Sequence, residues 1–233
     1  MITVRKAEDR GPSKLNWLDS KHTFSFAGYF DPNHMGFESL RVINDDRVTP
    51  GAGFGTHPHN NMEIITYVLY GALEHKDSMG NGSIIRPGDI QRMSAGTGVL
   101  HSEYNHSKTK GVHFLQIWIL PEKNGIQPSY DQKFFGEESK RGRLALLASR
   151  EARGESIALN QDADLYAGLF DGEEQATHKF APGRSGWLHV ARGEVTLNDG
   201  MHLKAGDGVA IRNETSINLS QGKNAEVLLF DLA

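Results

Sequence analysis

The stretch Ile65-Thr-Tyr-Val-Leu-Tyr-Gly71 decides the fold, because the chain carries a second copy of it at Leu188-His-Val-Ala-Arg-Gly193. Three further blocks recur in the same order around the two copies. They are Thr56-His-Pro58 with Thr177-His-Lys179, Ile85-Arg-Pro-Gly-Asp89 with Leu203-Lys-Ala-Gly-Asp207, and Phe114–Leu120 with Val227–Leu232. The differences in spacing fall in turns, where surface loops tolerate insertions. A repeat in this order predicts a duplicated structural unit.

The runs around these blocks are short, apolar and rich in β-branched and aromatic residues. Sustained helical periodicity is absent, and the 26 glycines among 233 residues separate the runs at regular intervals. This pattern predicts an all-β chain that forms sandwiches or barrels, with a helical turn or two at most. The expected strands are Ile64–Tyr70, Ile84–Ile85, Ile90–Met93, Val112–Leu120, Leu144–Ala148, Trp187–Val190, Glu194–Leu197, Gly208–Ile211 and Val227–Asp231.

The two copies predict two barrels that follow one another along the chain. We expect the first barrel over residues 1–130 and the second over residues 144–233. Residues 131–143 would connect them, since the stretch from Pro121 to Arg143 is rich in Pro, Gly, Gln, Lys and Glu.

Composition excludes several classes of function. The chain has no cysteine, which removes disulfides, thiolate metal sites and thiol nucleophiles. Its 25 basic and 29 acidic residues give a net charge of −4 with no basic run, so nucleic acids and anionic membrane surfaces are not expected partners. No apolar stretch is long enough to cross a membrane, and the N-terminal residues are charged, which predicts a cytoplasmic location.

Two pairs of residues in the first half have the spacing of metal ligands. His57-Pro-His59 follows the glycine-rich stretch Gly51–Gly55 and precedes a strand, and His101-Ser-Glu103 follows Gly96-Thr-Gly98. Residues at i and i+2 of a strand face the same side, so each pair can direct two ligands to one point. Three imidazoles and one carboxylate would bind one divalent cation and leave coordination positions open for water, substrate or dioxygen. Iron, manganese, cobalt, nickel, copper and zinc all fit this ligand set.

Glu63, four residues after His59, has three possible roles: a fifth ligand, an acceptor that orients an imidazole, or a paired charge. The acceptor role is favoured. The other histidines of the first half lack a partner at i+2 and are expected at the surface or in hydrogen bonds, and His75 in Glu74–Ser78 fits the polar end of a hairpin. They are His22, His34, His75, His106 and His113.

The second half lacks the ligand pattern of the first. His178 is the repeat counterpart of His57, but Phe180 stands in the place of His59, and no His-x-Glu follows Ile211. We therefore expect the second barrel to be free of metal and to have a structural role. The chain also has no phosphate-binding loop of the Walker type and no Gly-x-Ser-x-Gly, so nucleotide and serine-hydrolase chemistry are not supported.

Longer motifs extend these patterns to a resemblance with a known family. Gly51-x5-His57-x-His59-x3-Glu63 resembles the first cupin motif, and Pro87-Gly88 with Gly98-x2-His101-x3-Asn105 resembles parts of the second. The stretches Trp17–Asp31, Leu40–Asp46, Gly55–His59, Glu74–Ser78 and Ser94–Asn105 together resemble the pirins, and among them the bacterial pirin-like quercetin dioxygenases. The likeness covers most of residues 1–125, and the repeat carries it through the second half.

The resemblance implies an all-β bicupin, in which two consecutive cupin-type β-barrels (double-stranded β-helices) pack together. It implies one divalent metal ion bound by His57, His59, His101 and Glu103, with Glu63 outside the ligand set. The implied activity is that of a metal-dependent quercetin 2,3-dioxygenase, which opens the flavonol ring with O2 and releases carbon monoxide. Glu103 or a displaced solvent molecule would take the proton of the flavonol hydroxyl.

Two other functions stay open at this point. The chain could be a non-enzymatic, metal-binding pirin that acts as a sensor or regulator through a protein partner, as pirins of eukaryotic nuclei do. It could also be a cupin that acts on another phenolic or sugar-like substrate, with quercetin turnover incidental.

Overall fold

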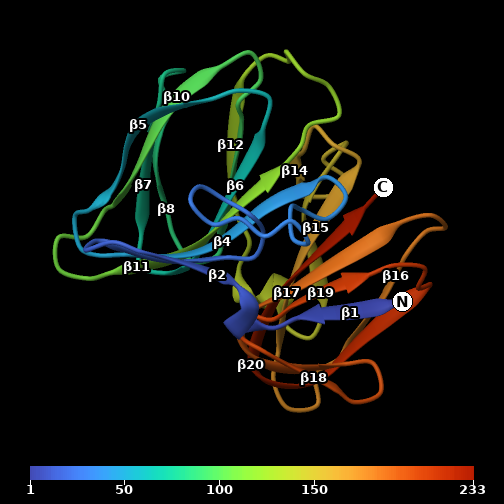
Figure 1. The fold of residues 1–233 in the computed structure, drawn as a ribbon. Helices are drawn as coiled ribbons and strands as arrows, with labels where there is room; N and C mark the ends of the chain where they lie inside the picture. The colour runs from blue at the N-terminus through green and yellow to red at the C-terminus, as the bar shows by residue number, and fades with distance from the viewer. The chain divides into compact units, whose positions relative to one another are not determined.

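The computed structural model describes residues 1–233, and its regular secondary structure is almost entirely β-strand (Figure 1), which confirms the expected all-β class. The two short helices are η1 (Ala7–Asp9) and α1 (Glu137–Lys140). Neither helix has the length or the apolar character to cross a membrane. Backbone contacts divide the chain into an N-terminal unit (Gly11–Phe134 with Leu159–Gln161) and a C-terminal unit (Met1–Arg10, Phe135–Ala158 and Asp162–Ala233).

The N-terminal unit contains two antiparallel sheets. The larger has the strand order β12-β9-β6-β11-β4-β3-β2, and the smaller has the order β5-β10-β7-β8. The strands are β2 (Gly11–Lys14), β3 (Leu18–His22), β4 (Leu40–Val48), β5 (Gly53–His59), β6 (Glu63–Tyr70), β7 (Leu73–Asp77), β8 (Gly82–Ile85), β9 (Asp89–Ser94), β10 (Val99–Asn105), β11 (Val112–Ile119) and β12 (Ser129–Phe134).

Strand alternation explains which side chains of β10 face inward. Val99, His101, Glu103 and Asn105 are buried, whereas the residues between them are wholly or partly exposed. Successive side chains of a strand point to opposite faces, so the spacing of two residues sends the imidazole of His101 and the carboxyl of Glu103 into the unit. Strand β6 differs because seven of its eight residues are buried, as expected for a central strand covered on both faces.

The C-terminal unit is built on one large sheet with the order β1-β19-β17-β20-β15-β13-β14, in which β16 also pairs with β20 and β18 with β17. The long strand β17 spans both of the strands expected at Trp187–Val190 and Glu194–Leu197, with no break between them. The strands are β1 (Ile2–Arg5), β13 (Leu144–Ser149), β14 (Ile157–Ala158), β15 (Ala163–Phe170), β16 (Ala176–Lys179), β17 (Ser185–Leu197), β18 (Met201–Lys204), β19 (Gly208–Ile211) and β20 (Ser216–Leu232).

The units interleave along the chain, whereas the expected ranges 1–130, 131–143 and 144–233 are consecutive. Strand β1 pairs with β19, which places Met1–Arg10 in the C-terminal unit. Strand β12, at the expected connection, pairs with β9 and extends the larger sheet of the N-terminal unit. Residues Leu159–Gln161 also belong to the N-terminal unit. The separate roles assigned to the two ranges stay a prediction.

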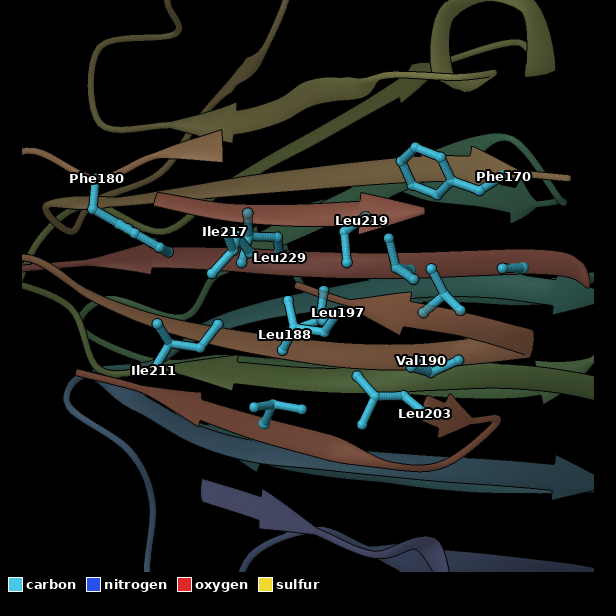
Figure 2. Packing of buried hydrophobic residues seen from close by; sticks show 14 residues of the cluster. Phe170, Phe180, Leu188, Val190, Leu197, Leu203, Ile211, Ile217, Leu219 and Leu229 are labelled. Carbon is cyan, nitrogen blue, oxygen red and sulfur yellow. The ribbon is translucent and has the colours of Figure 1, made fainter. Parts of the chain in front are cut away.

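Apolar side chains fill the interior of the C-terminal unit. Figure 2 shows this cluster, in which Leu188, Leu219 and Leu229 are fully buried. It draws on five strands as well as on Phe180, which follows β16. Burial of about 25 cal/mol for each Å² of apolar surface makes such a cluster the main source of stability of a β-barrel.

Candidate metal centre

Three imidazoles of the N-terminal unit converge on one point. His57 and His59 extend from β5, and His101 lies opposite His57 in the paired strand β10. One ring nitrogen of each of the three lies within 4.8 Å of the others. The ring centroids are 4.4 Å apart for His57 and His101 and 4.9 Å apart for His59 and His101. The predicted spacing of two residues thus places His57 and His59 on the same side of one strand.

The backbones of β5 and β10 approach closely beside these ligands. A Cβ atom on Gly53 would lie 2.2 Å from the carbonyl oxygen of Glu103, so only glycine allows the two strands this distance. The pairing shifts by one residue between His101 and Glu103, where β5 carries the extra residue. A bulge of this kind redirects side chains near a site.

The hydrogen bonds of the rings indicate how they would bind a cation. The Nδ1–H of His57 donates to the carbonyl oxygen of Gly55 at 2.7 Å, which leaves Nε2 with a free lone pair. This Nε2 lies 3.0 Å from Nε2 of His101. Two nitrogens bound to one ion at about 2.1 Å, with a right angle between the bonds, lie about 3.0 Å apart. The two rings therefore fit a shared divalent cation.

Burial keeps the rings of His59 and His101 in the neutral form that binds metals. The pKa of His59 is lowered to about 4, by burial first and then by the neighbouring charge of His57. The pKa of His101 is lowered to about 2, again by burial first and then by the other histidines. Metal binding requires deprotonated imidazole, so near neutral pH these groups lose no free energy to deprotonation on binding.

Glu103 is buried beside His101, but it does not join the group formed by His57 and His59. Its carboxylate lies within 4.8 Å of ring nitrogens of His101 and His75, so His101 belongs to both groups. The Thr66 hydroxyl donates to Oε1 of Glu103 at 3.3 Å. Burial raises the pKa of Glu103 to about 7, and the charge of Asp46 contributes to this rise.

The four predicted ligands border one cavity of about 340 Å³. Part of its lining is aromatic, and Trp118 packs edge-on against both His59, at 4.9 Å, and Phe26, at 5.3 Å. Polar side chains also line the cavity, and no lysine or arginine is among the residues that border it. The aromatic side chains are Trp17, Phe26, Phe54 and Trp118, and the polar ones include Ser20, His22, Asn44, Asp46 and Gln116.

Comparison with known proteins assigns the chain to a family. The sequence model of the family described as Pirin matches residues 3–119, and the model described as the quercetinase C-terminal cupin domain matches residues 146–232. A protein named quercetin 2,3-dioxygenase from Escherichia coli (strain K12) is 51% identical over 232 residues, which covers 100% of this chain and 99% of that protein.

The chain belongs to the pirin family. The crystal structure of the bacterial pirin YhhW from Escherichia coli in complex with nickel(II) superposes with a TM-score of 0.94 at 50% identity, covering 100% of this chain and 99% of that one. A pirin-like protein of Caulobacter vibrioides is 39% identical over 234 residues, and the alignment covers 100% of each chain. The bicupin fold and the pirin resemblance expected from the sequence are therefore confirmed.

Two residues at the site of this pirin were not predicted. His75 was expected in the polar end of a hairpin, but it is fully buried on β7 and lies next to His101 and Glu103. Asp46, on β4, is buried in the cavity wall, where burial raises its pKa to about 7. Neither residue stands in a metal-ligand motif. The only sequence signal is that each lies in a strand that mixes polar and apolar residues, β7 for His75 and β4 for Asp46.

Glu63 makes no hydrogen bond to the predicted metal ligands. Its Oε2 accepts hydrogen bonds from the Ser94 hydroxyl at 2.9 Å and from the backbone and side-chain nitrogens of Asn160 at 3.1 and 3.2 Å. None of the hydrogen bonds found for its carboxylate comes from an imidazole. Glu63 instead holds the segment Leu159–Gln161, so the favoured role as an acceptor that orients an imidazole is not seen.

Strand register shows what replaces the ligands in the second half of this pirin. His178 pairs with Ile217 as His57 pairs with His101, and Leu219 follows Ile217 as Glu103 follows His101. Phe180, Ile217 and Leu219 all belong to the apolar cluster in Figure 2. Three of the four ligand positions thus hold apolar side chains.

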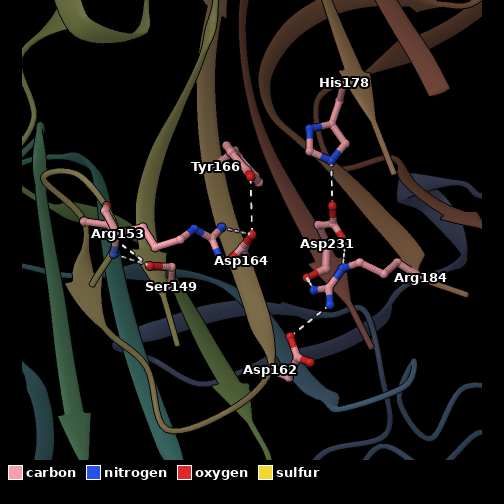
Figure 3. Close-up of polar contacts among 9 residues, drawn as sticks. Ser149, Arg153, Asp162, Asp164, Tyr166, His178, Arg184 and Asp231 are labelled. Carbon is pink, nitrogen blue, oxygen red and sulfur yellow. Dashed lines mark hydrogen bonds and ion pairs between the residues drawn. The ribbon is translucent and has the colours of Figure 1, made fainter. Parts of the chain in front are cut away.

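His178, at the fourth of these positions, is engaged in an ion-pair network. Figure 3 shows the His178 ring directed at Asp231, with Nε2 at 2.7 Å from Oδ2. Asp231 also accepts from the guanidinium of Arg184, which extends to Asp162 at 2.9 Å. A protein cation therefore neutralises the carboxylates beside the counterpart of His57.

Proposed function

We propose that this chain is a metal-dependent quercetin 2,3-dioxygenase, which opens the flavonol ring with O2 and releases carbon monoxide. The observation that carries the proposal is the convergence of His57, His59 and His101 on a cavity with aromatic walls. The names of the full-length relatives from Escherichia coli support it. We assign His57, His59, His101 and Glu103 as the ligands of one divalent cation.

The cation would lower the pKa of the flavonol hydroxyl and hold the resulting oxyanion. Glu103 is the group of the chain suited to take the proton. Its carboxyl is buried at the cavity beside His101, where a hydroxyl bound by the cation would meet it. The Thr66 hydroxyl, at 3.3 Å from Oε1, fixes the orientation of the carboxylate.

The size and lining of the cavity support an aromatic substrate such as a flavonol. Its volume of about 340 Å³ falls within the range of small-molecule sites. The aromatic side chains would stack on a flat ring system, and polar groups such as Asn44 and Gln116 can bond its hydroxyls. The cavity has no cationic side chain, so a neutral polyphenol suits it better than a carboxylated aromatic.

A direct assay separates this activity from the alternative of a non-enzymatic pirin. Metal-loaded protein is mixed with quercetin under air, and the flavonol absorption band, O2 uptake and carbon monoxide are followed together. Loss of the band with release of carbon monoxide, absent under argon and in metal-stripped protein, is expected. A band that persists in fully metal-loaded protein would contradict the proposal and favour a regulatory role. The cytoplasmic location and the absence of nucleic-acid partners stay predictions from composition.

A further inference from the structure

His75 forms a buried pair with Asp77 directly behind the proposed metal centre. The side chains of both residues are fully buried, and Nε2 of His75 lies 3.2 Å from Oδ2 of Asp77. The same carboxylate accepts from the backbone nitrogens of Met79 and Asn81 and from the side-chain amide of Asn81. These donors hold Asp77 as an acceptor, so we assign the hydrogen of the neutral His75 ring to Nε2.

The ring of His75 is also held from the side. It stacks on Tyr130, with centroids 5.0 Å apart and an angle of 29° between the planes. The Tyr130 hydroxyl bonds Ser83 and lies 2.8 Å from Oε1 of Gln132, which anchors that ring in turn. His75 is therefore confined in both its tautomer and its orientation.

This arrangement leaves one acceptor without a partner. With its hydrogen on Nε2, His75 presents a lone pair on Nδ1, and Nδ1 is buried with no hydrogen bond. A buried acceptor without a partner destabilises the folded protein. Glu103 lies opposite His75 in the strand pairing, but its carboxylate already accepts from Thr66 and interacts with Gln116.

His101 would supply a donor for this acceptor once its Nε2 binds a cation. Nε2 of His101 faces Nε2 of His57, so Nε2 is the nitrogen available to a cation. A ring that binds metal through Nε2 carries its hydrogen on Nδ1. Nδ1 of His101 is buried and has no partner, and the ring lies 5.4 Å from that of His75.

We propose that His75 is a positioning residue of the metal centre, whose Nδ1 accepts a hydrogen bond from Nδ1–H of His101 when His101 binds the cation. The bond completes a chain from Asp77 through His75 to His101. This inference rests on the proposed metal centre. The hydrogen bond would fix the ring of His101 and increase the basicity of its Nε2. Loss of such a partner lowers metal affinity by about 10- to 100-fold.

The first test uses the unmutated protein. Histidine labelled with the NMR-active nitrogen isotope is combined with the NMR-active isotope of cadmium as the probe. Coupling to cadmium is expected for Nε2 of His101 and for one nitrogen each of His57 and His59, but not for His75. We also expect the His75 hydrogen on Nε2 and a slowly exchanging Nδ1–H of His101 with a cross-peak to His75.

Two results would overturn the proposal. Coupling between cadmium and Nδ1 of His75 would make His75 a direct ligand, and rapid solvent exchange of the His101 Nδ1–H would mean that no acceptor holds it. If none of His57, His59 and His101 couples to cadmium, the proposed metal centre itself is contradicted, which is a separate failure.

A variant pair tests the energetic consequence. His75→Leu removes the acceptor at similar volume, whereas His75→Gln retains an oxygen acceptor. We expect His75→Leu to weaken zinc binding by about 10-fold or more in competition with a chelator, and His75→Gln to restore most of it. A purely space-filling role predicts that the two folded variants bind zinc equally, which would contradict the proposal.

Discussion

Nε2 of His57 and Nε2 of His101 face each other at 3.0 Å across the paired strands β5 and β10. Two acceptor nitrogens at this distance repel one another unless a proton or a cation lies between them. The hydrogen bond from His57 to Gly55 O places its only hydrogen on Nδ1, so either a hydrogen on Nε2 of His101 or a shared cation can lie between the two Nε2 atoms.

The first prediction concerns this pair. We expect His57→Ala to lower zinc or nickel affinity by more than about 100-fold, because it removes a ligand rather than an outer partner. The matched control is His178→Gln, which alters the repeat counterpart in the C-terminal unit. Elemental analysis of both purified proteins should show metal lost only from His57→Ala, and equal metal content would contradict the ligand assignment.

The second prediction concerns the pH dependence caused by Asp46. Burial raises its pKa from 3.8 to about 7 in the folded protein, so the folded state holds the proton to higher pH than the unfolded state. The contribution of Asp46 to stability is therefore complete below about pH 4 and is lost as pH rises through 7.

Asp46→Asn should remove this loss. In metal-free protein, we expect the free energy of unfolding of the variant, relative to that of wild type, to rise by up to roughly 4 kcal/mol between pH 4 and pH 8. Denaturant unfolding at the two pH values measures the gain, and the difference between variant and wild type reports the titration of Asp46 together with its coupling to Glu103. A constant difference across this range would show that the Asp46 pKa is not raised.

The third prediction separates Glu63 from the metal centre. Glu63→Gln weakens the charge-assisted hydrogen bonds to Ser94 and Asn160, and such bonds contribute about 1.5–3 kcal/mol each. We expect a loss of about 2 kcal/mol in urea unfolding, with metal content and affinity unchanged. Loss of metal from the folded variant would return Glu63 to the ligand shell.

The fourth prediction concerns the aromatic wall. Trp118 contacts both His59 and Phe26, so Trp118→Ala should enlarge the cavity and raise KM for quercetin by roughly tenfold while the metal stays bound. Trp118→Phe retains an aromatic ring and should keep KM within about threefold. Steady-state kinetics on metal-saturated protein measures both, and an unchanged KM in Trp118→Ala would mean that the substrate does not use this wall.

The sequence by itself determined the strand content and the two pairs proposed as metal ligands. In runs such as Ile64–Tyr70, every residue but the last is buried, and runs so rich in β-branched and apolar residues are legible without a structure. The pairs His57/His59 and His101/Glu103 are legible for a related reason. The side-chain period of a strand is two, so their spacing alone places each pair on one face.

Tertiary structure alone decided which groups meet. Strand β7 is polar, so its sequence resembled a turn, and only its pairing with β10 brings His75 and Asp77 behind His101. The pairing of β1 with β19 joins residues about 200 positions apart, and the bonds of Glu63 reach Asn160. Local propensity reports the conformation of a segment and the face of each side chain. The identity of its neighbours depends on register and closure of the whole sheet, which no single stretch encodes.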